Sequence, residues 1–206
     1  MLTIIQAAGW PIWPLIACSI LALALVIERF VALRTPRIAP PQLLDEVLTV
    51  CAKGLPSNET VGQLAQNSLL GEVLATGLRT LQTHPTSSEA ELRSAMEGAG
   101  RTAAHRLEKY LTALATIASA APLLGLLGTV IGMIELFGAT TPTGANPQQL
   151  AHGISVALYN TAFGLVVAIP SMIFYRHFRA KVDALLVSME QQAIHLVDVV
   201  HGDRDR

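Results

Sequence analysis

Apolar residues gather in three long runs along the chain, and polar residues fill the stretches between them. The runs cover roughly residues 12–31, 111–137 and 154–174. A helix that spans a bilayer needs about 20 mostly apolar residues, and each run is long enough. The pattern therefore predicts an all-α membrane protein with three transmembrane helices. The first is the weakest of the three, because its uninterrupted apolar core is short.

The second and third runs belong to longer amphipathic helices. Ser88 with Glu91 has the spacing of a capping box, which starts a helix, and nothing stops that helix before Gly138. Apolar residues at three-to-four spacing lead into the second run: Leu92, Met96, Ala99, Ala103, Leu107 and Leu111. The same spacing continues after the third run: Val182, Leu185, Met189, Ala193, Leu196 and Val200. We therefore expect one unbroken helix over residues 88–138 and two long antiparallel helices that extend into the cytoplasm.

The stretch between the first two runs predicts several shorter helices. A proline-rich break covers residues 35–41, and helical patterns follow over residues 42–52, 61–66 and 69–81. Glycine and proline residues separate these patterns. The apolar faces of the short helices would cover the two long helices, which gives a cytoplasmic helical bundle beneath three spans.

Composition and charge agree with a membrane protein and indicate its orientation. Hydrophobic residues make up 51% of the chain and charged residues 14%, with a mean hydropathy of +0.47. Lys and Arg near the ends of membrane helices stay on the cytoplasmic side. These residues follow the first run, precede the second and follow the third: Arg29, Arg34, Arg37, Arg101, Arg106, Lys109, Arg176, Arg179 and Lys181. The amino terminus and the uncharged loop over residues 139–150 are therefore expected to face outward.

This orientation divides the chain into four parts. Residues 1–34 hold the outward amino terminus and the first transmembrane helix, and residues 35–110 form a cytoplasmic helical segment. Residues 111–175 hold the second and third transmembrane helices with their outer loop, and residues 176–206 form a cytoplasmic C-terminal helix. A cleaved signal peptide has its positive charge before the apolar run. Here the charge follows it, so the first helix is expected to stay as an anchor.

No motif for catalysis, cofactor binding or metal binding stands out. The six histidines and two cysteines show no metal-ligand spacing, and neither a phosphate-binding loop nor a nucleophile elbow occurs in the sequence. Cys18 lies in the first span and Cys51 in the cytoplasmic segment, so a disulfide between them is not expected. Glu28 and Arg29 at the end of the first span are expected to form a solvated ion pair. No basic patch with interleaved aromatic residues indicates nucleic-acid binding. The chain is therefore expected not to be an enzyme.

Two threonines lie inside the second and third runs. Thr129 is nine residues before Gly138 and Thr161 nine residues after His152, so each lies about 13 Å inside the outer end of its helix. Small residues surround them at helical spacing: Gly125, Gly128, Gly132, Gly153, Ala157, Gly164 and Ala168. Two interpretations stay open. Either these faces only pack, with each hydroxyl satisfied by a carbonyl a turn earlier, or the hydroxyls line a polar seam that holds water or guides an ion.

The ionisable residues limit how a proton could cross. A threonine does not titrate, so a proton path needs a carboxylate or a histidine, and none lies near the expected bilayer centre. Glu135 lies in the second run close to its outer end, on a different face from Thr129. It either reaches the outer interface or a neighbouring subunit, or helps to collect protons at the outer mouth. If protons move, a partner must bring the titrating group.

Two blocks resemble the MotA/TolQ/ExbB family of bacterial proton-channel subunits, and more closely its ExbB and TolQ branch. They read LLGLLGTVIGMIELF over residues 123–137 and GISVALYNTAFGLVVAIP over residues 153–170. The resemblance implies a homo-oligomeric ring, five-fold in this family, in the bacterial inner membrane with a periplasmic amino terminus. The ring would enclose the single transmembrane helices of an ExbD-like or TolR-like partner that carries an aspartate. Thr129 and Thr161 match the family's threonines that line the pore near that aspartate.

The chain departs from the family pattern at Val156, where many ExbB and TolQ members have a glutamate. A proton-pathway role for that position does not transfer. The resemblance implies an ExbB-like motor subunit that uses the proton motive force to energise envelope transport through a TonB-like or TolA-like protein. The alternatives are a TolQ-like subunit that supports envelope integrity and division, and a non-conducting scaffold.

Overall fold

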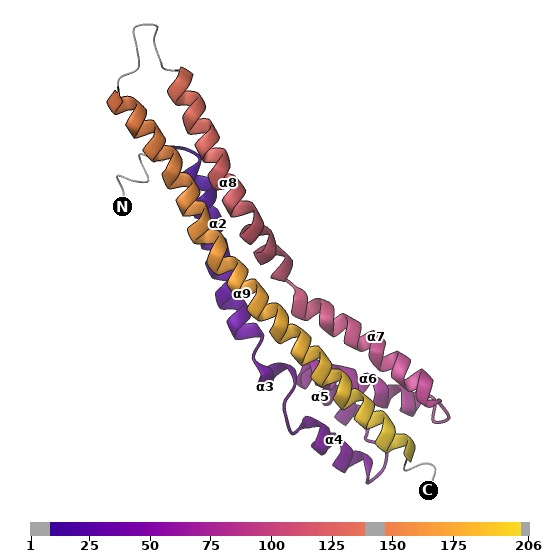
Figure 1. Cartoon of the computed structure of the whole chain (residues 1–206). Coiled ribbons are helices and arrows are strands. Elements are labelled where there is room, and N and C mark those ends of the chain that lie inside the picture. Colours follow the sequence, from indigo (N-terminus) through magenta and orange to yellow (C-terminus); the bar gives the residue numbers. More distant parts are fainter. Residues whose placement is uncertain (1–8, 139–146, 203–206) are drawn as a thin grey trace. The chain divides into compact units, whose positions relative to one another are not determined.

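The computed structural model describes residues 9–138 and 147–202, and every regular element within these ranges is a helix. Three of the helices contain stretches that are long and apolar enough to cross a membrane (Figure 1). They are α2, Ile12–Ala32; α8, Leu111–Gly138; and α9, Pro147–Gly202. Each includes one of the three apolar runs of the sequence. The chain is therefore a multi-pass membrane protein whose described elements are all helices.

The first of two compact units holds the membrane-type helices. It consists of Met1–Arg29 and Tyr110–His177, which includes most of α2, all of α8 and the first part of α9. Leu15 of α2, Ala121 of α8, and Val167 and Ala168 of α9 form its buried cluster. The outward faces of the helices carry exposed Leu, Ile, Val and Phe side chains, as expected for surfaces that meet lipid.

The second unit consists of Phe30–Lys109 and Phe178–Arg206. Its helices before the last part of α9 are α3, Thr35–Ile38; α4, Leu43–Cys51; α5, Asn58–Asn67; α6, Leu69–Thr83; and α7, Glu89–Glu108. The short helix α3 lies in the stretch expected to be only a proline-rich break. A proline is tolerated there because it occupies the first turn, where the missing N–H would have no partner.

In the second unit, polar caps define where helices begin and an apolar core holds the helices together. The Ser88 hydroxyl accepts from the backbone N–H of Glu91, whose carboxylate accepts from the N–H of Ser88, so the capping box predicted at the start of α7 is confirmed. The largest fully buried side chains are aliphatic or aromatic, among them Leu70, Leu74, Leu78, Leu81, Leu92, Phe178, Val182 and Leu196. The ion pairs across the helices, such as Arg106 with Glu72 at 2.6 Å, are exposed and contribute little. Apolar burial is the main stabilising term.

The long helix expected over residues 88–138 is broken at Lys109 and Tyr110. Helix α7 ends at Glu108 and α8 begins at Leu111. Lys109 has an extended ψ of 134°, and Tyr110 has a positive φ of 70°. A left-handed conformation costs a bulky residue about 1–3 kcal/mol, so its surroundings must hold it there. The expectation of one unbroken helix was therefore wrong.

The Tyr110 ring packs against a buried arginine. The Arg29 guanidinium carbon lies 5.3 Å from the centroid of that ring, a cation–π distance. The Arg29 side chain is 5% exposed and the Glu28 side chain 43%, and Arg29 Nη2 donates to Glu28 Oε1 over 2.7 Å. The expected ion pair therefore forms, but its arginine is buried while its glutamate stays exposed. Arginine tolerates burial here because its planar, weakly hydrated group stacks on an aromatic face while it donates to a carboxylate.

Candidate functional site

Glycines bring the backbones of α8 and α9 together in the first unit. A Cβ atom added to Gly125 would lie 2.7 Å from the carbonyl oxygen of Asn160, and one added to Gly164 would lie 2.7 Å from that of Ala121. Real Cβ atoms essentially never approach another atom closer than 3.0 Å. These positions therefore require glycine, which is how helices approach closely in lipid.

The Thr161 hydroxyl crosses from α9 to α8. Its Oγ1 donates to the carbonyl oxygen of Gly125 over 3.4 Å, which is long for a hydrogen bond between two oxygen atoms. The short approach of the glycine backbones places this carbonyl within reach, because no Cβ atom of Gly125 covers it. Thr161 is half-buried. Its hydroxyl oxygen keeps its acceptor capacity for another group.

The Thr129 hydroxyl stays on its own helix. Its Oγ1 donates to the carbonyl oxygen of Leu126, three residues earlier, over 2.7 Å. This is the local bond by which threonines in membrane helices commonly satisfy their donor. The structure therefore connects the two threonines to the same turn of α8, from Gly125 to Gly128, and each hydroxyl donates to a backbone carbonyl of that turn.

Gly132 and Glu135, two further candidate residues, lie nearer the end of α8. A Cβ atom added to Gly132 would lie 3.8 Å from the Cβ of Ala157, an ordinary van der Waals contact. Gly132 is therefore less restricted than Gly125 or Gly164. Glu135 is exposed, so its carboxylate is available to solvent, to a lipid headgroup or to another chain. The side chain of Val156 lies outside the described part of the structure.

Asn160 is a polar residue that the sequence interpretation passed over. It is 1% exposed, although it lies within the third apolar run. A Cβ atom added to Gly128 would lie 2.8 Å from Asn160 Cβ and 2.9 Å from its Cγ, so the asparagine side chain occupies the space that Gly128 leaves open. An asparagine one position before Thr161 in an apolar helix was a visible signal, because polar residues in spans usually face the protein interior.

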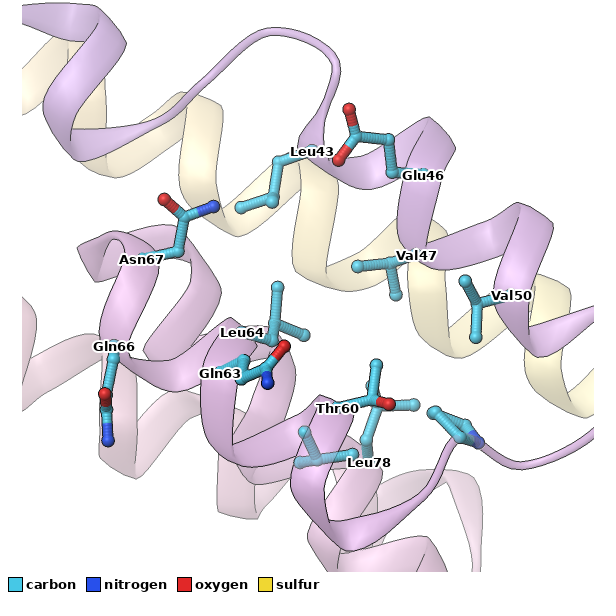
Figure 2. Close-up of a pocket in the computed structure, with 12 residues that line it drawn as sticks. Leu43, Glu46, Val47, Val50, Thr60, Gln63, Leu64, Gln66, Asn67 and Leu78 are labelled. Atoms are coloured by element: carbon cyan, nitrogen blue, oxygen red, sulfur yellow. The ribbon is translucent and has the colours of Figure 1, made fainter.

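The second unit contains grooves of a different kind. One of about 510 Å³ lies between α4 and α5, where Leu43 and Val47 face Leu64 and Thr60 (Figure 2). Another of about 460 Å³ lies between α7 and the last part of α9. In the ranges that the structure describes, no three His, Cys, Asp or Glu residues lie together in a way that could hold a metal ion. The polar groups between α8 and α9 are hydroxyls and an amide, which can bind water but do not change charge.

Comparison with known proteins places this arrangement in context. Residues 65–191 match the sequence model of the MotA/TolQ/ExbB proton channel family. The putative biopolymer transport protein ExbB-like 3 of Synechocystis sp. is 34% identical over 85% of this chain and 83% of its own length. The biopolymer transport protein exbB1 of Vibrio cholerae is 31% identical over 81% of this chain and 74% of its own length. The Tol-Pal system protein TolQ of Pseudomonas aeruginosa is 29% identical over 84% of this chain and 78% of its own length.

Proposed function

Because the chain belongs to the MotA/TolQ/ExbB proton channel family, we propose that it is an ExbB-like subunit of a proton-driven motor in a bacterial inner membrane. It forms a homo-oligomeric ring, five-fold as the resemblance implies, around a single-span partner of the ExbD or TolR kind. The output is the energising of envelope transport through a TonB-like or TolA-like protein. The observation that supports this most is the family match, which covers α6, α7, α8 and most of α9.

In this function the chain contributes hydroxyls along the proposed proton path and one carboxylate at its outer end. The hydroxyls of Thr129 on α8 and Thr161 on α9 both lie at one turn of α8. Water can bind to their oxygens there and carry a proton. The group that changes charge is an aspartate of the partner, because a threonine does not titrate. Glu135, exposed near the end of α8, gathers protons at the periplasmic mouth.

The energy available is sufficient for mechanical work. One elementary charge that crosses a potential of 100 mV releases about 2.3 kcal/mol. Several protons together can therefore drive one step of the partner helices inside the ring. The proposed orientation, with the amino terminus in the periplasm and the carboxyl terminus in the cytoplasm, follows the distribution of Lys and Arg along the chain.

The test is proton flux into liposomes that contain this protein and its single-span partner. We expect Thr129→Val and Thr161→Val each to lower the flux while the complex stays assembled, since valine keeps the shape of threonine and removes its hydroxyl. Thr116→Val is the matched control. Thr116 lies on α8, as Thr129 does; it is exposed, and its hydroxyl donates to the carbonyl of Thr112 over 2.9 Å.

A non-conducting scaffold is the second candidate, and one observation favours it. Both hydroxyls reach a backbone carbonyl, Thr129 that of Leu126 and Thr161 that of Gly125, so packing alone gives each a partner. Flux that is absent from every sample would support the scaffold against the motor. Flux that is present and the same in all variants would show that the two threonines only pack and that the proton path lies elsewhere. Co-purification with a TonB-like or a TolA-like protein separates ExbB-like uptake from the TolQ-like alternative.

A further inference from the structure

Asn160 occupies a position where a polar side chain is costly. It lies in the apolar part of α9 and is 1% exposed. A polar group placed in an apolar environment loses its hydration, and polar residues inside membrane spans are rare and usually face a neighbouring helix. An alanine at this place would avoid that cost. The burial of an asparagine therefore indicates a specific task at the contact with α8.

The geometry shows what the side chain does at that contact. Its Cβ, Cγ and Nδ2 would lie 2.8, 2.9 and 3.1 Å from a Cβ atom on Gly128. The side chain therefore fills the space left by the missing side chain of Gly128, which we call the Gly128 notch. The next residue, Thr161, donates to the carbonyl of Gly125 over 3.4 Å. Two consecutive residues of α9 thus hold the two ends of one turn of α8, which begins at Gly125 and ends at Gly128.

We propose that Asn160 is a positioning residue that fixes the longitudinal register of α9 against α8. With its side chain in the Gly128 notch, α9 cannot slide along α8 without a collision, and the Thr161 hydroxyl stays opposite the Gly125 carbonyl. A slide of one residue is about 1.5 Å, which is more than the 3.4 Å hydrogen bond can absorb. The consequence for proton flux rests on the proposed function, whereas the register itself does not.

The register can be read with engineered cysteines in the full chain. Gly132→Cys with Ala157→Cys places the two Cβ atoms 3.8 Å apart, which is about the mean Cβ separation of a disulfide. Gly132→Cys with Gly153→Cys is the off-register pair, one helical turn away. Cys18 and Cys51 are first replaced by alanine. Membranes that contain the protein are oxidised with copper phenanthroline in air, and the two disulfides are quantified on gels.

We expect Asn160→Ala to lower the yield of the 132–157 disulfide about threefold or more, in line with the free energy of polar contacts between membrane helices, and to raise the 132–153 disulfide. Asn160→Ser, which also shortens the side chain that fills the notch, is used in its place if Asn160→Ala does not accumulate in membranes. Ser171→Ala is the matched control. Ser171 is also buried in α9, but its hydroxyl donates to the carbonyl of Val167 on the same helix over 2.7 Å, so its loss leaves the register unchanged.

Two results would overturn the proposal. One is a ratio of the two disulfides that stays the same when Asn160 is replaced. The other is an equal fall of both disulfides, which reports general destabilisation and no change of register. Proton flux is measured in the same samples. A changed register with no flux in any sample would retain the positioning role and reject the motor.

Discussion

Gly164→Ala tests the close approach of α8 and α9 most directly. The new Cβ would lie 2.7 Å from the carbonyl oxygen of Ala121, about 0.7 Å inside the 3.4 Å at which ordinary contact begins. It would also lie 3.2 Å from the Cα of Gly125. Both neighbours are backbone atoms, so no side chain can rotate away. The helices must separate, and the 3.4 Å hydrogen bond of Thr161 to Gly125 breaks with them.

A matched glycine isolates the magnitude. Gly132→Ala makes the same chemical change on the facing helix, where the added Cβ would lie 3.8 Å from Ala157 Cβ, without a collision. Both variants gain the same helix propensity, about 0.8–1.0 kcal/mol in water. The difference between them is therefore the overpacking term alone, which is typically about 1–3 kcal/mol. We expect Gly164→Ala to be less stable than Gly132→Ala by that amount.

The assay is unfolding of each purified variant in mild detergent by titration with SDS, followed by circular dichroism. The same samples are run for oligomeric state by size-exclusion chromatography, so that loss of assembly is distinguished from loss of fold. Equal midpoints for Gly164→Ala and Gly132→Ala would refute the reasoning, because the backbone contact would then not be as close as described.

Two further predictions concern other parts of the chain. Burial raises the pKa of the Cys51 thiol, and only the thiolate reacts with alkylating agents. In a Cys18→Ala background, alkylation of the folded protein should therefore require a higher pH than alkylation of the denatured chain. Coincident pH profiles of the two alkylation rates would contradict this. Trp10 and Trp13 are the two tryptophans of the chain. Both are exposed; Trp10 lies just before α2 and Trp13 lies in its first turn, and aromatic residues of this kind sit at membrane interfaces. Their fluorescence should therefore be quenched more by lipids brominated near the headgroup than by lipids brominated near the chain ends, and the opposite order would count against α2 crossing the bilayer in this way.

The sequence predicted the helices well because their signals are local. Apolar runs set the membrane-type stretches of α2, α8 and α9, and the capping box of Ser88 and Glu91 set the start of α7. The break at Tyr110 could not be predicted in this way. Neither glycine nor proline marks it, and the conformation depends on Arg29, which is distant in the sequence and packs on the Tyr110 ring.

The candidate site was predictable in composition but not in geometry. The small residues and Thr129 with Thr161 could be identified from helical spacing. Which hydroxyl crosses to the other helix depends on the rotation of α8 and α9 about their axes, and that rotation is set by where backbones can touch. For the same reason Asn160 was overlooked, because the notch of Gly128 that receives its side chain exists only once the two helices are packed.

The glycine contacts between α8 and α9 also limit which amino-acid substitutions this helix pair can accept during evolution. Every single-nucleotide change that replaces a glycine codon's amino acid introduces a residue with a Cβ atom. At Gly125, Gly128 and Gly164 that atom has no room, so no single-nucleotide change gives a residue that fits. At Leu123, which is 66% exposed, many apolar residues serve equally well. Divergence in this helix pair should therefore be concentrated on its outer faces, and a lineage could change the glycines only by compensating on the other helix at the same time.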